Sequence, residues 1–273
     1  MKHLKIKISE AIDFANLTID AFDTELLMCF VKKVDRSYLY AHRNEFLTKE
    51  EKTYFFELVE MRKLKKPLAY LLGKKGFWKN DFYINSSVLV PRPETEILVE
   101  KILDYDLTGK ELLELGVGSG VISISLGLEN HKLSIIGTDS SIDALKVANI
   151  NSKKLNSENV VFLNHDWNNK WLFPKMDFIV SNPPYVSKSE LIGNEDGIWF
   201  EPEMALFSDD AGMTDIKTII FKSINFLKNN GKLLLEHAPN QAKKIVKEAK
   251  KAGYTKIEQI NDYNGLSRVS ILS

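Results

Sequence analysis

Cysteine is almost absent from this chain, and other absences narrow further what the protein can be. The 273 residues include one cysteine, Cys29, which excludes an internal disulfide and a metal cluster held by cysteines. The five histidines show no metal-ligand spacing, so we expect no metal. No apolar stretch reaches about 18 residues, and the first residues do not resemble a signal peptide. We therefore expect a cytoplasmic protein that does not bind membranes.

Neither sign of charge is in excess. The chain has 37 Lys and Arg residues and 37 Asp and Glu residues, which gives a formal net charge of zero. Stable binding to nucleic acid depends largely on basic residues that neutralise phosphates, so this balance argues against it. Hydrophobic residues make up 44% of the chain, which is enough for globular domains. The length fits one large domain or two ordinary ones.

One segment departs from the even balance of charge. Seven basic residues and no acidic residue lie between Arg62 and Lys79. Such a run is most often a solvated face, but it can also be a docking surface for an acidic partner or for RNA near the substrate. The sequence leaves both interpretations open.

The first part of the chain has helical periodicity, and a second pattern follows it. Residues 1–72 predict a small all-helical domain, in which Thr48 to Glu51 resembles a capped helix start. Residues 73–95 predict a β-hairpin linker, because short apolar runs flank the turn residues Asn80-Asp81 and Asn85-Ser86. The short strands are expected at Phe77-Trp78, Phe82-Tyr-Ile84 and Val88-Leu-Val90.

Residues 96–273 alternate between apolar runs typical of strands and segments with helical periodicity. This alternation predicts a mainly parallel sheet with helices on both faces, because a helix usually connects one parallel strand to the next. The strands are expected at Leu112 to Leu115, Leu133 to Gly137, Val160 to Leu163, Phe178 to Val180 and Leu233 to Glu236, near Ile257, and at Val269 to Ile271. The fold class is therefore α/β, with the helical domain and the hairpin linker before the sheet.

A glycine-rich loop joins the first of these strands to its helix. Glycines spaced by two allow the backbone to approach a ligand closely at the N-terminus of a helix. A dinucleotide fingerprint needs a third glycine at position 121, which is Val121, so a pyrophosphate is not the favoured ligand. The candidate cofactor-binding residues of this glycine loop are Gly116, Val117, Gly118, Ser119 and Gly120.

Acidic and aromatic residues follow the next two strands. Asp139 ends the second strand, where its carboxylate can accept hydrogen bonds from both hydroxyls of a ribose. It can instead cap the helix that begins near Ser140. Asp166 can offer a carboxylate to an adenine amine and Trp167 its ring to the base, although Trp167 also suits core packing. With the glycine loop, these residues predict a site for a nucleoside cofactor.

Asn182-Pro-Pro-Tyr185 follows another apolar run, so it lies at the carboxyl end of a buried strand, where open α/β sheets bind ligands. The Asn182 side-chain oxygen can accept a hydrogen bond, and Pro183 and Pro184 have no N–H to pair with a neighbouring strand, which leaves their carbonyls free. Tyr185 supplies a face for stacking. This segment, the amide clamp, suits an NH2 group on a flat base or a side-chain amide. Alone, the same motif can also be a strand-ending turn.

The order of the glycine loop, Asp139, Asp166-Trp167 and the amide clamp resembles that of class I S-adenosylmethionine-dependent methyltransferases that act on amino groups. More narrowly, the chain resembles the release factor glutamine N5-methyltransferases, and the similarity runs almost from end to end. The further matching segments are Pro67-Leu-Ala-Tyr70 with Gly73, Pro91-Arg-Pro-Glu-Thr-Glu96, Glu201-Pro-Glu-Met-Ala-Leu206, Leu235-Glu236 with Gln241, and Asp262 with Gly265 and Arg268. Each segment alone is weak evidence for the resemblance, but the segments together are specific for this family.

This resemblance implies a Rossmann-like methyltransferase sheet over residues 96–273 and S-adenosylmethionine as the methyl donor. It implies that the glycine loop, Asp139, Trp167 and Asn182 line the cofactor site. It further implies that the amide clamp holds the glutamine of a Gly-Gly-Gln loop, and that the partners are class I peptide-chain release factors. The residues expected to act in catalysis are Asn182, Pro183 and Tyr185.

Two departures from the family pattern bear on loop geometry. His165 stands where the family often has glycine, and Ser208 to Met213 alters the family's Gly-Gly-x-Asp-Gly-Leu segment. The first change bears on the conformation of the loop around Trp167, and the second on the conformation of residues 208–213. The amide clamp itself is intact.

Three other functions remain open at this point. An adenine N6-methyltransferase would use the same clamp on a base, but it must extrude that base and hold the nucleic-acid backbone, and no base-reading motif is recognisable. A glutamine methyltransferase that acts on a ribosomal protein would use the same chemistry. A catalytically silent binding module would use the fold only as a scaffold, and the intact loop and clamp argue against it.

Overall fold

The computed structural model describes residues 5–188 and 197–273, which form two compact units. A helical unit reaches to Gly73 and also includes Gly197 to Phe200, and an α/β unit comprises the remaining residues from Lys74 onward. Over the described ranges, no helix is long and apolar enough to cross a membrane.

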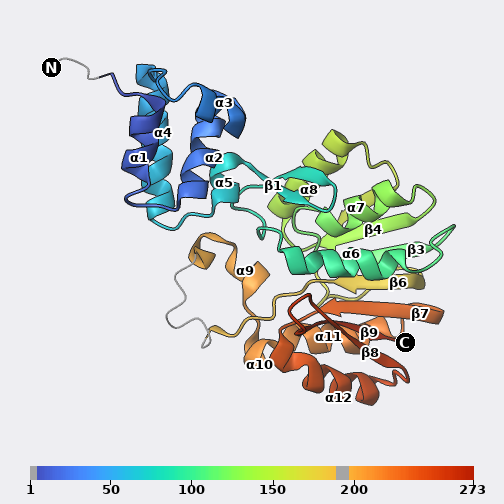
Figure 1. Ribbon diagram of the computed structural model, residues 1–273. Helices are drawn as coiled ribbons and strands as arrows, with labels where there is room; N and C mark the ends of the chain where they lie inside the picture. The colour runs from blue at the N-terminus through green and yellow to red at the C-terminus, as the bar shows by residue number, and fades with distance from the viewer. Residues whose placement is uncertain (1–4, 189–196) are drawn as a thin grey trace. The chain divides into compact units, whose positions relative to one another are not determined.

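The helical unit packs amphipathic helices around a small apolar core (Figure 1). Leu27, Met28 and Phe55 are fully buried in it. Thr48 and Glu51 form a capping box at the start of the longest helix, as predicted from the sequence. The helices are α1 (Ile8–Ala15), α2 (Ala21–Lys32), α3 (Arg36–Ala41), α4 (Lys49–Lys63) and α5 (Leu68–Leu72), with a short 3-10 helix η3 (Ile198–Phe200).

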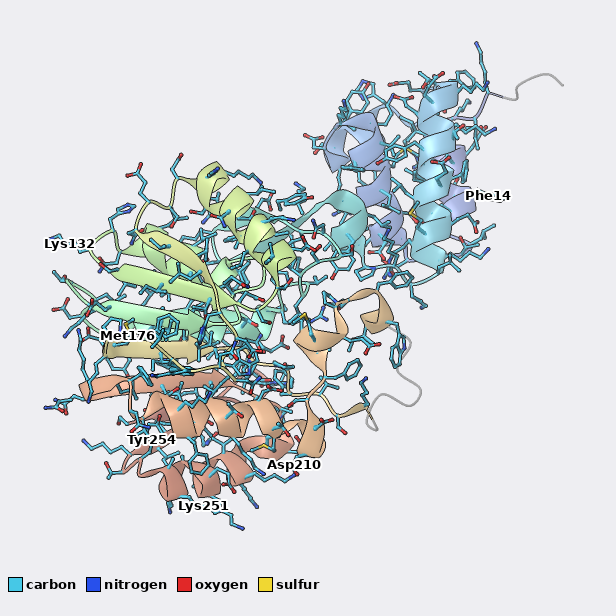
Figure 2. The ribbon with its side chains drawn as sticks, turned by 180° about the vertical axis from the view of Figure 1, so that it is seen from behind. Phe14, Lys132, Met176, Asp210, Lys251 and Tyr254 are labelled. Atoms are coloured by element: carbon cyan, nitrogen blue, oxygen red, sulfur yellow. The ribbon has the colours of Figure 1, made fainter. Side chains whose placement is uncertain are left out.

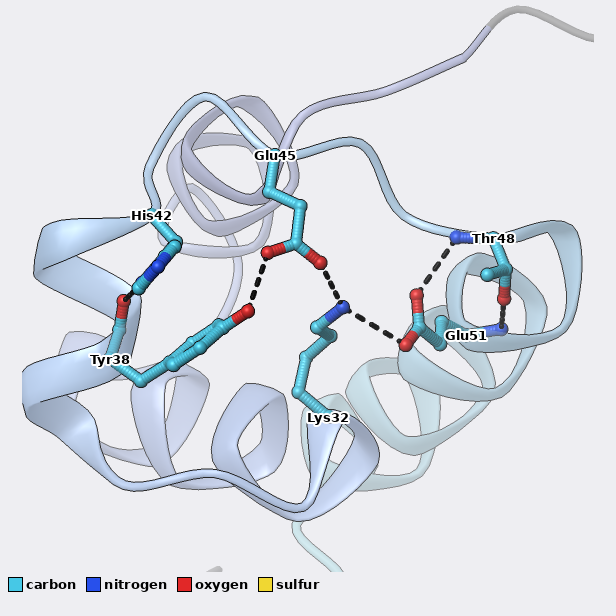
Figure 3. Close-up of polar contacts among 6 residues, drawn as sticks. All are labelled: Lys32, Tyr38, His42, Glu45, Thr48 and Glu51. Carbon is cyan, nitrogen blue, oxygen red and sulfur yellow. Dashed lines mark hydrogen bonds and ion pairs between the residues drawn. The ribbon is translucent and has the colours of Figure 1, made fainter.

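A polar network ties α2 to the start of α4 (Figure 3). The nearly buried Lys32 ammonium lies 2.6 Å from Glu45 Oε1 and 3.1 Å from Glu51 Oε1. Tyr38 donates its hydroxyl to the other oxygen of Glu45 at 2.7 Å, and the Thr48 backbone N–H donates to Glu51 at 2.8 Å. Exposed ion pairs contribute little to the stability of a fold. A lysine that is shielded from water and has two carboxylate partners holds those partners in place more firmly.

The α/β unit begins with a β-hairpin, β1 (Lys74–Phe77) paired with β2 (Asn80–Tyr83). The predicted turn at Asn80-Asp81 is wrong, because Phe77 pairs directly with Asn80 and leaves Trp78-Lys79 as the turn. Trp78 adopts a left-handed backbone conformation in this turn, with a φ of 53°. Its backbone N–H donates to Glu96 and its ring N–H donates to Glu129, each at 2.7 Å. These contacts join the hairpin to two helices of the same unit, Glu96–Leu103 and Val121–Glu129.

The expected strand at Val88-Leu-Val90 is also wrong. The segment is irregular, and the Val90 N–H donates to a carboxylate oxygen of Glu201 at 2.8 Å, not to a neighbouring strand. Val88 and Val90 are buried all the same. Their apolar character therefore indicates burial, not β-structure.

The main sheet has seven strands in the order β5-β4-β3-β6-β7-β9-β8 (Figure 1). Neighbouring strands are parallel except at β9, which pairs antiparallel with both β7 and β8. The prediction of a mainly parallel α/β sheet is confirmed. The strands are β3 (Glu111–Leu115), β4 (Ser134–Asp139), β5 (Val160–Asn164), β6 (Met176–Ser181), β7 (Leu227–Glu236), β8 (Ile257–Asn261) and β9 (Ser267–Leu272).

Helices cover the sheet in two groups, one made of α6, α7 and α8 and the other of α11 and α12 (Figure 1). Met176 and Tyr254, labelled in Figure 2, belong to the core between the sheet and the second group. The longer helices are α6 (Glu96–Leu103), α7 (Val121–Glu129), α8 (Ile142–Leu155), α11 (Thr214–Ser223) and α12 (Ala242–Ala252). The shorter ones are η1 (Pro93–Thr95), α9 (Glu203–Leu206), α10 (Asp209–Gly212) and η4 (Pro239–Gln241).

The strand order reverses between β3 and β6. From β3 the chain continues to one side through β4 and β5, then crosses over to β6 and β7 on the other side. A crevice opens at the carboxyl ends of the strands at such a switch point, and ligands of open α/β sheets bind there. The glycine loop follows β3 and the amide clamp follows β6, so the fold brings both to this crevice.

Candidate functional site

A pocket lies at the carboxyl ends of β3, β4 and β6. It contains about 780 Å³ of empty space, part of it open to solvent. Eight of the predicted site residues line it: Gly116, Val117, Gly118, Ser119, Asp139, Trp167, Asn182 and Pro184. The fold therefore brings the candidate cofactor residues and part of the amide clamp together in a single pocket.

Four predicted residues do not line this pocket. Gly120 is the N-cap of α7 with φ 82°, and a Cβ there would lie 2.9 Å from the Ile124 side chain, so it permits close helix packing. The Asp166 carboxylate accepts from the Asn168 backbone N–H at 2.8 Å. Pro183 is buried, and the partly buried Tyr185 packs against the core between the sheet and α11 and α12.

The glycine loop folds back onto the end of β4. The N–H groups of Gly116 and Val117 both donate to the Thr138 carbonyl, at 2.8 and 3.0 Å. Gly116 has a φ of 78°, and a Cβ there would lie 3.0 Å from the Trp167 ring. Glycine is therefore required both for the left-handed backbone and for the close approach of the aromatic ring.

Asp139 supports the glycine loop and faces the pocket. One of its oxygens accepts from the Gly118 N–H and the other from the Ser141 N–H, each at 2.9 Å. The cap of α8 is Ser141, whose hydroxyl accepts from the Ala144 N–H at 3.2 Å. Burial raises the pKa of Asp139, and the backbone donors oppose that shift. Each carboxylate oxygen keeps a second lone pair with which it can accept from a ligand hydroxyl.

We expect the Asp139→Ala variant to bind S-adenosylmethionine at least tenfold more weakly, because it lacks acceptors for charge-assisted hydrogen bonds worth roughly 1.5–3 kcal/mol each. Asp143→Ala is the matched control: it removes an exposed carboxylate from the first turn of α8, where Asp143 pairs with Lys146. Titration calorimetry of both variants measures the effect. Equal affinities would show that Asp139 has no direct role in cofactor binding.

Glu114 is a pocket residue to which the sequence patterns assigned no role. It is 1% exposed and lines the pocket beneath the glycine loop. One of its oxygens accepts from both the backbone N–H and the hydroxyl of Ser123, the former at 2.9 Å. Burial raises the Glu114 pKa to about 8. An ionisable residue inside the apolar run Leu112 to Leu115 was the signal available in the sequence.

The orientation of the clamp amide is set by a residue far away in the sequence. Asn182 donates its side-chain N–H to the Thr95 hydroxyl at 3.1 Å. Thr95 is 3% exposed and ends the short helix η1. Because the nitrogen is engaged in this way, the Asn182 side-chain oxygen remains the acceptor available to a ligand. Thr95 lies in a segment that matches the family, but sequence reasoning gave it no function.

Tyr185 is fixed at both ends. Its hydroxyl donates to Glu236 at 3.1 Å, and its carbonyl accepts from the Gln241 side chain at 2.9 Å. A Cβ on Gly212 would lie 1.9 Å from the same carbonyl, so only glycine fits beside it. Burial raises the pKa of Tyr185, so its hydroxyl stays protonated as a donor.

The two departures from the family pattern leave the pocket lining untouched. In the altered segment, Asp210 and Ala211 have φ values of 54° and 52° and take the left-handed conformation without glycine. The carbonyl of Ala211 accepts from Gln241 at 3.1 Å, which holds this loop against the clamp. The ring of His165 packs edge-on against Phe173 with 4.9 Å between centroids.

An ion pair braces one rim of the pocket. Arg92 lies 2.5 Å from an oxygen of Glu201, whose other oxygen accepts from the Val90 N–H. The Glu201 side chain is only 3% exposed. Arg92 lines the pocket, as do Pro202 and Met204 on the segment that follows Glu201.

Comparison with known proteins shows similarity along nearly the whole chain. Residues 7–73 match the PrmC N-terminal domain, and residues 93–194 match the methyltransferase small domain. The release factor glutamine methyltransferase of Buchnera aphidicola from Acyrthosiphon pisum is 40% identical over 253 residues, which cover 92% of this chain and 90% of the relative. The protein of the same name from Shewanella oneidensis is 32% identical over 271 residues, covering 97% and 95%.

Solved structures show the same fold at low sequence identity. A methyltransferase from Pyrococcus furiosus has a TM-score of 0.53 at 16% identity and covers 82% of this chain and 98% of that one. A ribosomal protein L11 methylase from Lactobacillus delbrueckii has a TM-score of 0.51 at 16% identity, covering 73% and 89%. At such identities the likeness concerns the fold alone.

Proposed function

The chain belongs to the release factor glutamine methyltransferases, and we propose that it methylates the N5 amide nitrogen of glutamine in the Gly-Gly-Gln motif of class I peptide-chain release factors. S-adenosylmethionine is the methyl donor. The observation that carries this proposal is the shared pocket. In it Asn182 and Pro184 of the amide clamp lie with the glycine loop and Asp139, so an acceptor for an amide N–H lies beside a site suited to a nucleoside.

The pocket residues fit a nucleoside cofactor. We assign Asp139 to the ribose hydroxyls, because its carboxylate faces the pocket and retains acceptor capacity. Gly116 to Ser119 supply a backbone surface without large side chains, and Trp167 offers its ring. Asp166 directly precedes Trp167 but does not line the pocket, and its assignment to the adenine amine rests on the sequence pattern alone. When bound, S-adenosylmethionine supplies an electrophilic methyl group on a sulfonium centre.

The protein's part in the reaction is to position the substrate amide and to shift electron density onto its nitrogen. An amide nitrogen is a weak nucleophile because its lone pair is delocalised into the carbonyl. We assign the Asn182 side-chain oxygen and the Pro183 carbonyl as acceptors for the two amide N–H groups and the Tyr185 ring as a stacking face for the amide. Of these three residues Asn182 lines the pocket. Orientation of this kind is worth up to roughly 7–11 kcal/mol. The nitrogen becomes acidic as the new bond forms and releases one proton to water, so a strong general base is not needed.

The helical unit is proposed to dock the release factor, and the reaction is proposed to take place in the cytoplasm. Part of the basic segment Arg62 to Lys79 is neutralised within the chain: Arg62 lies 2.5 Å from Asp23 and Lys79 lies 2.6 Å from Glu129. Lys74 pairs with Asp81 at 3.1 Å. These pairs favour a solvated face over a nucleic-acid surface, in keeping with no stable binding to nucleic acid.

Labelled cofactor tests the proposed substrate. We expect label to be transferred to the Gly-Gly-Gln glutamine of a class I release factor and to be lost when that glutamine is replaced by glutamate, which removes the nucleophilic nitrogen at nearly constant size. Peptide mass spectrometry locates the methyl group. Label on adenine in DNA or RNA, or on a ribosomal protein, with none on the release factor, would refute the proposal.

A further inference from the structure

A glutamate is buried behind the amide clamp. Glu236 is the last residue of β7 and is 1% exposed. β7 lies beside β6, with Leu235 paired to Ser181, so Glu236 is adjacent to the start of the clamp. Burying an ionisable group without a full set of partners is costly, and such a residue calls for an explanation.

Among the described residues, the side-chain hydrogen-bond partner of Glu236 is a residue of the clamp. One carboxyl oxygen accepts from the Tyr185 hydroxyl at 3.1 Å. Burial raises the pKa of Glu236 to about 7, and the nearby hydroxyl of Thr95, which accepts from the Asn182 amide, opposes that rise. The second oxygen of Glu236 is buried and has no hydrogen-bond partner among the described residues. The carboxyl group is therefore hydrogen-bonded directly to Tyr185 and lies near the threonine that orients Asn182.

Nothing in the packing of the sheet itself requires a carboxyl group at this position. The three residues before it in β7, Leu233, Leu234 and Leu235, are fully buried leucines that pack in the core. An apolar residue at position 236 would pack in the core as the three leucines do. It would, however, leave the Tyr185 hydroxyl, which is shielded from water, without an acceptor. The side chain of Glu236 therefore serves the amide clamp and not the packing of the sheet.

We propose that Glu236 is a positioning residue for methyl transfer, which holds the Tyr185 ring and, through Thr95, the Asn182 amide in the orientation that aims the substrate amide. This inference rests on the proposed function. Glu236 itself need not touch substrate or cofactor. Its carboxyl oxygen fixes the tilt of the ring by accepting from the phenol, while the opposite end of Tyr185 is already held by Gln241.

Single-turnover rates with saturating cofactor and release factor test this role. In Glu236→Ala we expect the rate to fall about 100-fold, the loss typical of a misplaced reacting group. The dissociation constant of S-adenosylmethionine should change by less than about threefold. Glu236→Gln should recover most of the rate, because an amide oxygen still accepts from Tyr185. A proton-accepting role predicts instead that Gln is as slow as Ala, which would overturn the proposal.

A double-mutant cycle with Tyr185→Phe separates positioning from a general effect on the fold. Phenylalanine keeps the ring and removes the hydroxyl, so the double variant should be little slower than Glu236→Ala alone. Additive losses would overturn the coupling. Tyr254→Phe is the matched control, since it removes another buried hydroxyl, which donates to the Ile220 carbonyl in the same core (Figure 2). We expect its rate to stay at the wild-type value.

The wild-type reaction distinguishes failure of this inference from failure of the proposed function. If the wild-type protein does not methylate the release factor glutamine, the proposed function fails. If it does and Glu236→Ala retains its rate, only the positioning role is refuted. Should Glu236→Ala not fold, the Glu236→Gln and Tyr185→Phe variants, with Thr95→Val, still decide the matter. Thr95→Val is expected to lower the rate with unchanged cofactor affinity, and a normal rate in both Tyr185→Phe and Thr95→Val would refute the role.

Discussion

The Asn182→Ala variant is expected to lose roughly 100- to 1,000-fold in turnover, the loss seen when one group that stabilises developing charge is removed from an active site. Asn182 is the clamp residue whose side-chain oxygen remains available after its nitrogen has donated to Thr95. The substrate amide nitrogen gains positive charge as it is methylated, so its N–H bonds bind an acceptor more tightly in the transition state than in the ground state. The turnover number at saturating substrate, measured with labelled cofactor, gives the effect.

Asn182→Asp serves as the comparison variant. Aspartate keeps acceptor oxygens at nearly the same size, and the Thr95 hydroxyl can reverse its role and donate to it. We therefore expect Asn182→Asp to retain more activity than Asn182→Ala. Cofactor affinity should fall less than turnover in both, because the glycine loop and Asp139 are unchanged. Near-normal turnover of Asn182→Ala would show that another group accepts the amide proton.

The parts of the site that the sequence predicts are those in which a short motif follows a strand. The glycine loop after β3, Asp139 at the end of β4 and Asn182 after β6 all line the pocket. In a parallel sheet the strands' carboxyl ends lie on the same edge, so their positions follow from local pattern and fold class. The same reasoning gives the alternation of strands and helices, although the exact ends differ by a few residues.

The parts that sequence reasoning missed depend on which segments meet. Thr95 reaches Asn182 across 87 positions, and Glu236 reaches Tyr185 across 51. The contact of Glu236 with Tyr185 requires β7 to lie next to β6, and periodicity predicts strands without their order. The hairpin turn was misplaced for a related reason: Trp78 takes a positive φ because Glu96 and Glu129, both on helices of the α/β unit, hold its two N–H groups. Tertiary contacts override local turn preference there.

The largest effect on stability is expected from Glu114→Gln, through its pH dependence. Burial raises the Glu114 pKa from 4.5 to about 8, so between these values the folded protein keeps a proton that the unfolded chain has lost. This proton's contribution to the free energy of unfolding is fully present below pH 4.5. It decreases by about 1.4 kcal/mol per pH unit as the pH rises and is lost at about pH 8. Over the whole window the loss amounts to about 5 kcal/mol at most.

Glutamine removes this titration and can still accept from the backbone and hydroxyl of Ser123 through its side-chain oxygen. We expect the wild-type and variant proteins to have similar free energies of unfolding near pH 5, and the variant to be the more stable by several kcal/mol near pH 8.5, roughly in proportion to the pKa shift. Glu236, whose pKa burial raises to about 7, contributes in the same direction in both proteins and cancels in the difference. The difference in the free energy of unfolding is measured by urea unfolding without cofactor. Tryptophan fluorescence reports on this unfolding, since Trp78, Trp167 and Trp171 lie in the α/β unit. Parallel stability curves across this pH range would show that Glu114 is ionised in the folded protein at neutral pH.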